Sequence, residues 1–474
     1  MNGPPPGRRS AQRPSERARR ADPARQAAFD TLRAVASQDA YANLVLPALL
    51  RDRRITGRDA AFATELAYGT LRMRGLYDAV LASCVNRNLA ELDEGLHDAL
   101  RLGVHQLVGM RVPPHAAVSE TVALVRHRVG HGPGGLTNAV LRKVAERDVE
   151  EWVAAVAPSA DTDPLGHLAV ARSHPLWVVR ALREALAGRG VPAEQLDDEL
   201  TALLAADNAA PQVTLVARPG LVDPAELVAA GGQPGRWSPY AVGWPAGDPG
   251  QLAAVRDGRA AIQDEGSQLV ATALADAELN GPDERWLDLC AGPGGKAGLL
   301  GALAAPRAAR LTAVEQAPHR ADLVRSAVAA LGDTVQVRTA DGRLVGEQEP
   351  ASYDRVLVDA PCSGLGALRR RPEARWRRTP ADLATLAPLQ RALLSSALDA
   401  VRPGGVVAYV TCSPHVAETR LVVDDVLRRR PDAARLDASA LVPVPDASDD
   451  SGTVQLWPHR HGTDAMFLAL IRRH

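Results

Sequence analysis

Lysine is nearly absent from this sequence, and long apolar runs are missing altogether. Lys143 and Lys296 are the only lysines among 55 basic residues, so arginine carries almost all of the positive charge. A lysine retained in such a background favours a place where a planar guanidinium does not fit, with chance retention as the alternative. No apolar run reaches the roughly eighteen residues that a membrane-spanning helix needs, so we expect no membrane segment.

Cysteine is also scarce, and its spacing excludes two uses. The cysteines are Cys84, Cys290, Cys362 and Cys412. These positions have no zinc-ligand spacing, and a chain of 474 residues needs no disulfide bonds to build a core. The basic N-terminus is not followed by an apolar segment, so we expect no secretory signal. We therefore predict a protein of the reducing cytoplasm, without a bound metal.

The net charge of -1 conceals a basic N-terminal arm. Residues 1–25 hold seven Arg against Glu16 and Asp22, a net charge of about +5. The segment is rich in proline, so we expect a disordered arm over residues 1–24. Such an arm is usually a solvated tail, although basic arms also bind phosphates. The length of 474 residues and the hydrophobic content of 46% predict two or three domains with buried cores.

Residues 25–148 are expected to be helical almost throughout. Apolar side chains recur at helical spacing, and no alternating strand pattern interrupts them. The helical stretches are 24–36, 41–52, 58–85 and 97–110. Amphipathic helices alone do not reveal a ligand, so the periodicity predicts a helical bundle and nothing more.

The pattern changes twice in the rest of the chain. Residues 149–258 give a weaker signal, in which helical stretches precede a strand-like segment at 211–218. The Gly- and Pro-rich run at 231–250 predicts a loop. From residue 259 onward, short apolar strands alternate with helices, which predicts a doubly wound, mostly parallel sheet.

A glycine-rich loop follows the first of these strands. It consists of Cys290, Ala291, Gly292, Pro293, Gly294, Gly295 and Lys296. Such a loop before a helix brings backbone N–H groups close to a ligand, where the helix dipole favours negative charge. The spacing matches neither a dinucleotide fingerprint nor a phosphate-binding P-loop, so the loop alone is weak evidence for a nucleotide-like cofactor.

Carboxylates at the ends of the next two strands strengthen the cofactor hypothesis. Glu315 ends the second strand, where it could accept from both ribose hydroxyls of S-adenosylmethionine (AdoMet). Asp341 ends the third strand and could accept from the adenine amino group. Ligands of open α/β sheets bind outside the carboxyl ends of the strands, where both acids are expected. Each acid alone could equally be a helix cap. Together they favour AdoMet, with flavin and NAD still open.

Two cysteines follow the fourth and fifth strands. Cys362 stands in DAPCSG, which begins at Asp359, and Cys412 stands in the tripeptide TCS. A cysteine beside an apolar strand is usually a small buried hydrophobe. These two are instead expected beside turns, at the sheet edge that carries the cofactor loop. That placement favours reactive thiols.

A thiol at this edge suits methylation of a pyrimidine carbon. C5 of cytosine is too electron-poor to attack a methyl sulfonium, but a thiolate that adds to C6 makes C5 nucleophilic. A free cysteine is mostly protonated at neutral pH, so a nearby cation such as Lys296 would raise the thiolate fraction. Asp359 could hold or protonate N3 of the base.

The motifs of both halves resemble known families. RRITGRDAAFATELAYGTLR, LRLGVHQL, VPPHAAVSETV and GLTNAVLRKV resemble the helical RNA-binding domain of the NusB family. QDEGSQLV, DLCAGPGGK, DAPCSGLGALRRRPEARW, YVTCS and GTVQLWPHRHGTDAMF resemble the Sun/Fmu-type bacterial 16S rRNA cytosine-5 methyltransferases. The resemblance covers nearly all of residues 25–474.

This resemblance implies a multidomain fold. Residues 25–148 would form an all-α NusB-like RNA-binding domain, and residues 149–258 a small α/β linking subdomain. Residues 259–474 would form a Rossmann-like class I AdoMet methyltransferase domain. The substrate would be RNA, 16S rRNA by the family, and the enzyme a monomer.

The resemblance also implies a role for each site residue. Cys412 would be the nucleophile, and Cys362 would assist release of the product. AdoMet would be held by the loop 290–296, with Glu315, Asp341 and Asp359. The loop departs from the family's usual CAAPGGKT, Glu315 replaces a more common Asp, and GTDAMF stands for GTDGFF. These changes are compatible with the activity, although the last could alter packing near the base pocket.

Residues 366–378 form a second basic segment, with six Arg against Glu373 and with Trp376 among them. A charge run is usually a solvated face, but this one begins close to Cys362 and would suit a single-stranded RNA. Other hypotheses stay open. The chain could be a non-catalytic RNA-binding or antitermination factor, an amino-group methyltransferase, or a methyltransferase of tRNA or another RNA.

Overall fold

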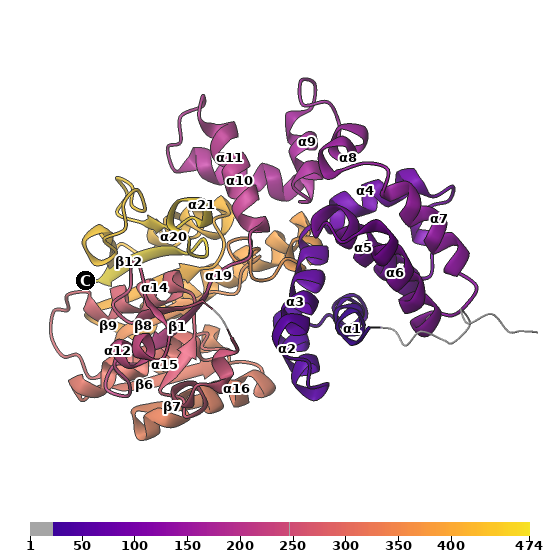
Figure 1. Ribbon diagram of the computed structural model, residues 1–474. Coiled ribbons are helices and arrows are strands. Elements are labelled where there is room, and N and C mark those ends of the chain that lie inside the picture. Colours follow the sequence, from indigo (N-terminus) through magenta and orange to yellow (C-terminus); the bar gives the residue numbers. More distant parts are fainter. Residues whose placement is uncertain (1–21, 246) are drawn as a thin grey trace, which may run out of the picture. The chain divides into compact units, whose positions relative to one another are not determined.

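The computed structural model describes residues 22–245 and 247–474, which fall into two compact units. The first unit ends at Ala157 and the second begins at Pro158. Figure 1 colours the helices of the first unit indigo to purple, and the strands near the C-terminus orange to yellow. Each unit is described separately below. The domain boundaries suggested by the sequence stay predictions.

The first unit is helical throughout its described residues, as predicted. Most of the basic arm expected over 1–24 lies outside the described residues, which begin at residue 22. A π-helical turn at His105–Gly109 continues the fifth helix. The α-helices are α1 (Pro23–Ser37), α2 (Ala42–Asp52), α3 (Gly57–Arg72), α4 (Arg74–Cys84), α5 (Glu94–Val104), α6 (Pro114–Arg128), α7 (Gly134–Val144) and α8 (Val149–Val156).

Local signals explain where these helices begin and end. The Asp22 carboxylate accepts from the Arg25 backbone N–H and caps α1. The stretch predicted as one helix over 58–85 divides at Met73 into α3 and α4, because Met73 leaves helical geometry (φ -98°, ψ 14°). A side chain at Gly69 would lie 2.1 Å from His105 Nε2, so glycine is required where α3 approaches the π-helical turn.

A small antiparallel sheet lies in the second unit, where the sequence signal was weak. Its strands follow the order β2-β3-β1-β4, and β1 confirms the strand expected at 211–218. The loop predicted over 231–250 is wrong in part, because AVGW forms β3 and pairs with β1. Short apolar segments flanked by Gly and Pro gain strand structure only when a partner is present. The bounds are β1 (Val213–Ala217), β2 (Gln233–Pro234), β3 (Ala241–Trp244) and β4 (Ala260–Ile262).

The larger sheet follows the order β10-β12-β9-β8-β5-β6-β7, with β11 paired to β12. β5, β6, β7, β8 and β9 run parallel to one another, whereas β12 is antiparallel to β9 and to β10. The mostly parallel sheet is therefore confirmed. The bounds are β5 (Arg285–Asp288), β6 (Arg310–Glu315), β7 (Val335–Thr339), β8 (Tyr353–Asp359), β9 (Val401–Thr411), β10 (Ala433–Leu436), β11 (Val454–Gln455) and β12 (Phe467–Arg473).

Helices cover both faces of the larger sheet. Along β9, Ala408 and Val410 pack into a core with α14 and α15, and Val407 and Tyr409 pack into a second core with α19 and α20. This alternation is what a strand buried on both faces produces. The helices are α9 (Pro164–Ala171), α10 (Leu176–Gly188), α11 (Leu196–Asn208), α12 (Pro224–Ala229), α13 (Ala253–Arg256), α14 (Glu265–Asp276), α15 (Gly295–Ala304), α16 (Pro318–Val328), α17 (Val345–Gln348), α18 (Ala374–Arg377), α19 (Pro380–Ala400), α20 (Arg420–Leu427) and α21 (Pro458–His461).

The strand order reverses between β5 and β8. The chain moves outward from β5 through β6 to β7, and then returns to the other side of β5 with β8 and β9. In sheets of this kind, the crevice outside the carboxyl ends at the reversal is where ligands bind. Within the described residues, no helix has the length and apolarity needed to cross a membrane.

Truncation of a buried leucine tests the packing of the first unit. Leu100 in α5 is 0% exposed, so Leu100→Ala should destabilise this unit by about 2–5 kcal/mol. Leu44 in α2 is 65% exposed, and Leu44→Ala is the control, with an expected change within about 0.5 kcal/mol. Urea unfolding followed by circular dichroism measures both changes. Equal losses would contradict the described packing.

Candidate active site

The predicted site residues follow the carboxyl ends of consecutive parallel strands. The loop 290–296 leaves β5, and Glu315 is the last residue of β6. Asp341 lies two residues after β7, where it caps a short 3-10 helix. Asp359 ends β8, and Cys412 follows β9 directly. Because the strands run parallel, these groups come to one edge of the sheet.

The glycine-rich loop is shaped by close approach. Gly294 has φ of +109° and precedes α15, and a side chain there would meet Ala327 at 2.6 Å. A side chain at Gly292 would lie 2.1 Å from Glu315 Oε2. Both glycines are therefore needed. The loop lies against the Glu315 carboxylate, and its backbone N–H groups precede the N-terminus of a helix.

The two acids expected to hold the nucleoside differ in their surroundings. Glu315 is buried and accepts from the Ala317 backbone N–H at 3.0 Å, with the Arg320 guanidinium 3.5 Å away. Asp341 is more exposed and accepts from both the backbone and the side chain of Arg343. The side-chain hydrogen bond from Arg343 lowers the pKa of Asp341, so this carboxylate is charged at neutral pH.

A partly buried ion pair joins the loop to β8. Lys296 Nζ donates to Asp359 Oδ2 at 2.8 Å. Burial by itself would lower the pKa of Lys296, but Asp359 and the nearby Cys412 outweigh it, so the pKa lies above the usual value. The ammonium is therefore charged, and it stands beside the nucleophile expected from the sequence.

The two thiols are in contact. Cys362 Sγ and Cys412 Sγ are 3.4 Å apart, although 50 residues separate them in the chain. The hydrogen bond from Cys362 lowers the pKa of Cys412 against the effect of burial, and Lys296 and Arg371 lower it further. The same hydrogen bond and burial raise the pKa of Cys362. A negative charge in the pair therefore belongs on Cys412, with the proton on Cys362.

Cys290 belongs to the loop but not to the sulfur pair. Its backbone N–H faces the Asp288 carboxylate at 3.4 Å, and burial raises the pKa of its thiol. Its side chain packs against the core that contains α19 and α20. Cys290 can therefore contribute its backbone to a ligand, whereas its thiol stays protonated.

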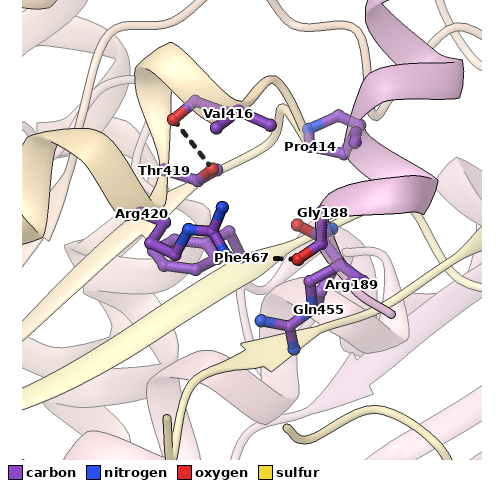
Figure 2. Close-up of a pocket in the computed structure, with 9 residues that line it drawn as sticks. Gly188, Arg189, Pro414, Val416, Thr419, Arg420, Gln455 and Phe467 are labelled. Atoms are coloured by element: carbon purple, nitrogen blue, oxygen red, sulfur yellow. Dashed lines mark hydrogen bonds between the residues drawn. The ribbon is translucent and has the colours of Figure 1, made fainter. Parts of the chain in front are cut away.

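Two hollows in the described residues are lined by groups other than the predicted site residues. The cavity in Figure 2 has about 20 Å³ and is lined by residues that include Gly188, Pro414, Thr419 and Phe467. It has room for a single water molecule. A larger, open hollow of about 530 Å³ is lined mainly by Pro and Ala side chains next to the small sheet.

Comparison with known proteins agrees with this arrangement. A family model described as 16S rRNA methyltransferase RsmB/F matches residues 277–472, and the NusB family model matches residues 22–146. A Mycobacterium tuberculosis protein that is provisionally named a methyltransferase is 56% identical over 96% of this chain and 98% of its own length. The ribosomal RNA small subunit methyltransferase B of Vibrio cholerae is 33% identical over 80% of this chain and 84% of its own.

The chain belongs to the RsmB/F methyltransferase family. The resemblance proposed from the sequence is thereby confirmed, and so are the helical NusB-like N-terminal part and the α/β methyltransferase part. The crystal structure of PH0851 supports the fold, with a TM-score of 0.78 at 21% identity over 95% of this chain and 98% of that one.

This RsmB/F methyltransferase uses much of its arginine-rich segment internally. Arg369 and Arg370 both donate to the carboxylates of Asp264 and Asp464. Arg375 is 0% exposed and donates to backbone carbonyl groups and to Asn208. The expectation that the whole run faces RNA is therefore wrong for these arginines. Their partners lie far away in the sequence, so the charge run gave no sign of them.

Two further buried polar residues near the glycine-rich loop, Asp288 and Gln263, were not predicted from the sequence. Asp288 ends β5 and is fully buried, and burial together with the nearby Asp359 raises its pKa to about 7. Asp288 follows the same apolar strand that leads into the cofactor loop, which was the available signal. The Gln263 amide is buried and makes no hydrogen bond within the described residues. A side chain at Gly295 would lie 4.0 Å from its Cδ, so an unpaired amide stands beside the start of α15.

Removal of the Lys296 ammonium tests the electrostatics of the sulfur pair. Lys296 lowers the pKa of Cys412, so Lys296→Ala should raise that pKa and decrease the thiolate fraction at neutral pH. The rate of Cys412 alkylation by iodoacetamide at pH 7 should fall several-fold, and its pH profile should move to higher pH. Lys143→Ala removes the other lysine and is the control. Unchanged alkylation in Lys296→Ala would contradict the described charge distribution.

Proposed function

We propose that the protein transfers a methyl group from AdoMet to C5 of a cytosine in RNA, through a covalent bond between Cys412 Sγ and C6. The observation that carries the proposal is the pair of thiols 3.4 Å apart, in which the pKa of Cys412 is lowered and that of Cys362 is raised. A single structural cysteine requires no such asymmetry. This asymmetry is expected of a nucleophilic thiol that lies beside a partner carrying the proton.

The residues around the loop fit AdoMet. Loop 290–296 offers backbone N–H groups at the start of α15, and the glycines at 292 and 294 leave room where a side chain would clash. In this proposal Glu315 would accept from the ribose hydroxyls and Asp341 from the adenine amino group, and Asp359 would contact the cofactor as well. The unpaired Gln263 amide and Asp288 Oδ2 are further polar atoms that a bound cofactor would satisfy.

The roles of the protein groups follow from cytosine chemistry. The Cys412 thiolate adds to C6, and the electron pair of the C5–C6 double bond moves into the ring, towards N3. Lys296 stabilises the thiolate before addition. Asp359 is held by Lys296 and lies near the base, where it could hold or protonate N3. AdoMet supplies the electrophilic methyl group that C5 then receives.

Release restores the free enzyme. A base removes the C5 proton, the electron pair re-forms the C5–C6 double bond, and Cys412 leaves as a thiolate. Cys362 assists this step, because its sulfur is in contact with the leaving sulfur and can accept or return a proton there. The enzyme therefore needs one thiol for addition and a second thiol for elimination.

The substrate is proposed from the relatives. The Vibrio cholerae relative is named a ribosomal RNA small subunit methyltransferase, and the family model refers to 16S rRNA. The NusB-like part adds an RNA-binding element that the family resemblance implies. The target cytosine must leave any base stack before C6 can meet a thiol, so we expect a single-stranded or flipped base. An rRNA substrate places the reaction in the cytoplasm, and we expect a monomer.

Substitution of the nucleophile tests the proposal. Cys412→Ala removes the only sulfur assigned to attack C6, so methyl transfer to 16S rRNA should fall by at least about 1,000-fold. Binding of AdoMet, measured by calorimetry, should be unchanged. Transfer of tritiated methyl groups measures the activity. Cys84→Ala is the matched control and should retain full activity, and appreciable activity in Cys412→Ala would exclude it as the nucleophile.

Substitution of the second thiol should trap the adduct. Cys362→Ala leaves Cys412 able to add to C6 but slows elimination, so an RNA–protein species should persist in denaturing gels. The double variant Cys362→Ala, Cys412→Ala should give no such species. Normal turnover in Cys362→Ala would show that Cys362 has only a structural role.

A further inference from the structure

A buried carboxylate lies next to the turn that carries Cys362 after β8 and the turn that carries Cys412 after β9, which are called the Cys362 loop and the Cys412 loop. Glu418 ends the short 3-10 helix Val416–Glu418 and is 0% exposed. Its Oε1 accepts from the Ser363 backbone N–H at 2.7 Å and from the Gln390 amide at 3.2 Å, and its Oε2 accepts from the Ser363 hydroxyl. Within the described residues, the donors that hold this buried carboxylate are all neutral groups.

These hydrogen bonds connect the two loops. Ser363 follows Cys362, and its hydroxyl is 3.0 Å from the hydroxyl of Ser413, which follows Cys412. Gln390 also donates to the backbone carbonyl of Pro361, the residue before Cys362, at 2.8 Å. The Cys362 loop is thus held on both sides. Through the serine pair, the same network reaches the Cys412 loop and fixes how far apart the two sulfurs lie.

The charge of Glu418 also acts on the sulfur pair. The field of Glu418 adds to the hydrogen bond that Cys362 donates to Cys412, and to burial, in raising the pKa of Cys362. The charges that act on Cys412 are different: Lys296 and Arg371 lower its pKa, and Asp359 raises it. The groups that favour a negative charge therefore act on Cys412, and Glu418 acts against one on Cys362. The carboxylate disfavours a thiolate on the wrong sulfur.

We propose that Glu418 is a positioning residue of the cysteine pair: it holds the Cys362 loop against the Cys412 loop and keeps the negative charge on Cys412. Glu418 touches neither sulfur and acts through Ser363 and through its field. The inference deepens the proposed function and rests on it for the effect on turnover. Its effect on the two thiols can be measured without any RNA.

The two parts of this role can be separated by substitution. Glu418→Gln keeps the size of the side chain and an acceptor for the Ser363 N–H, but it removes the charge. Glu418→Ala removes both the charge and the hydrogen bonds, and Ser363→Ala removes the hydroxyl that connects the loops. Asp354→Asn is the control for the loss of a buried carboxylate far from the thiols: Asp354 lies at the opposite end of β8, accepts backbone N–H groups and, unlike Glu418, also pairs with Arg402.

Labelling of the thiols provides the first measurement. The folded proteins are treated with less than one equivalent of iodoacetamide at pH 7, and peptide mass spectrometry gives the share of label on each cysteine. In the wild type, Cys412 should take most of the label of the pair. In Glu418→Gln, the share on Cys362 should rise several-fold, whereas Asp354→Asn should match the wild type. An unchanged share in Glu418→Gln would overturn the electrostatic part of the proposal.

Kinetics provide the second measurement. Glu418→Ala should lower kcat on the order of 10- to 100-fold, because a misplaced nucleophile loses its attack geometry, and Ser363→Ala should lower it in the same direction. KM for AdoMet should stay within twofold of the wild type. Glu418→Gln should recover most of the kcat lost in Glu418→Ala. If Glu418→Ala retains wild-type kcat, or if kcat and stability fall together in every variant including Asp354→Asn, Glu418 is only a structural residue.

The labelling result is independent of the transferase assay. If the wild type methylates no RNA but the label still moves to Cys362 in Glu418→Gln, the proposed function fails and the role of Glu418 in setting the charge of the pair stands. If the wild type is active and neither the label nor kcat responds to Glu418, the inference fails and the proposed function stands. Should Glu418→Ala not fold, Glu418→Gln and Ser363→Ala carry the same tests.

Discussion

The parallel pairing of β8 with β9 is the constraint on which the site depends. Asp359 lies opposite Val410 in this register, so both strands end at the same level of the sheet. The turns that follow therefore bring Cys362 and Cys412 to 3.4 Å, although 50 residues of chain separate them. The side chains of residues 356–358 and 406–410 are buried in one of two cores, so a slip in register would expose apolar groups and separate the thiols.

Around this pair of thiols, the charge of each ionisable group depends on its ion-pair and hydrogen-bond partners. Lys296 and Asp359 neutralise each other next to Cys412, and Asp288 is buried so completely that its pKa rises to about 7. Glu418, which acts on Cys362, accepts hydrogen bonds only from neutral donors among the residues that the structure describes. Electrostatic interactions are stronger in the low-dielectric interior of a protein, so each of these contacts shifts a pKa more than it would in water. The same chemistry in water would leave both thiols mostly protonated at neutral pH.

Much of the site could be predicted because it lies where strands end. The loop 290–296, Glu315 and the two cysteines all follow apolar runs, and a parallel sheet brings such ends together whatever the loops do. The retained Lys296 was a second useful signal, since its ammonium donates to Asp359 in a partly buried ion pair. These inferences require only the local sequence pattern and the rule that the carboxyl ends of parallel strands meet at one edge of a sheet.

Other features depend on contacts that no local pattern contains. β3 is four residues long and lies within a Gly- and Pro-rich run, so its pairing with β1 and β2 is what makes it a strand. Arg369 has its acidic partner Asp464 95 residues away, and a charge run says nothing about such a partner. The burial of Glu418 likewise arises from packing against residues on other elements. Tertiary context decides each of these cases.

The formation of 5-methylcytidine is the most direct test of the central claim. Unmodified 16S rRNA is incubated with AdoMet and either the wild type or Cys412→Ala, and its nucleosides are analysed by mass spectrometry. The account predicts 5-methylcytidine with the wild type and none with Cys412→Ala. A methylated nucleoside other than 5-methylcytidine, or 5-methylcytidine from both proteins, would contradict it.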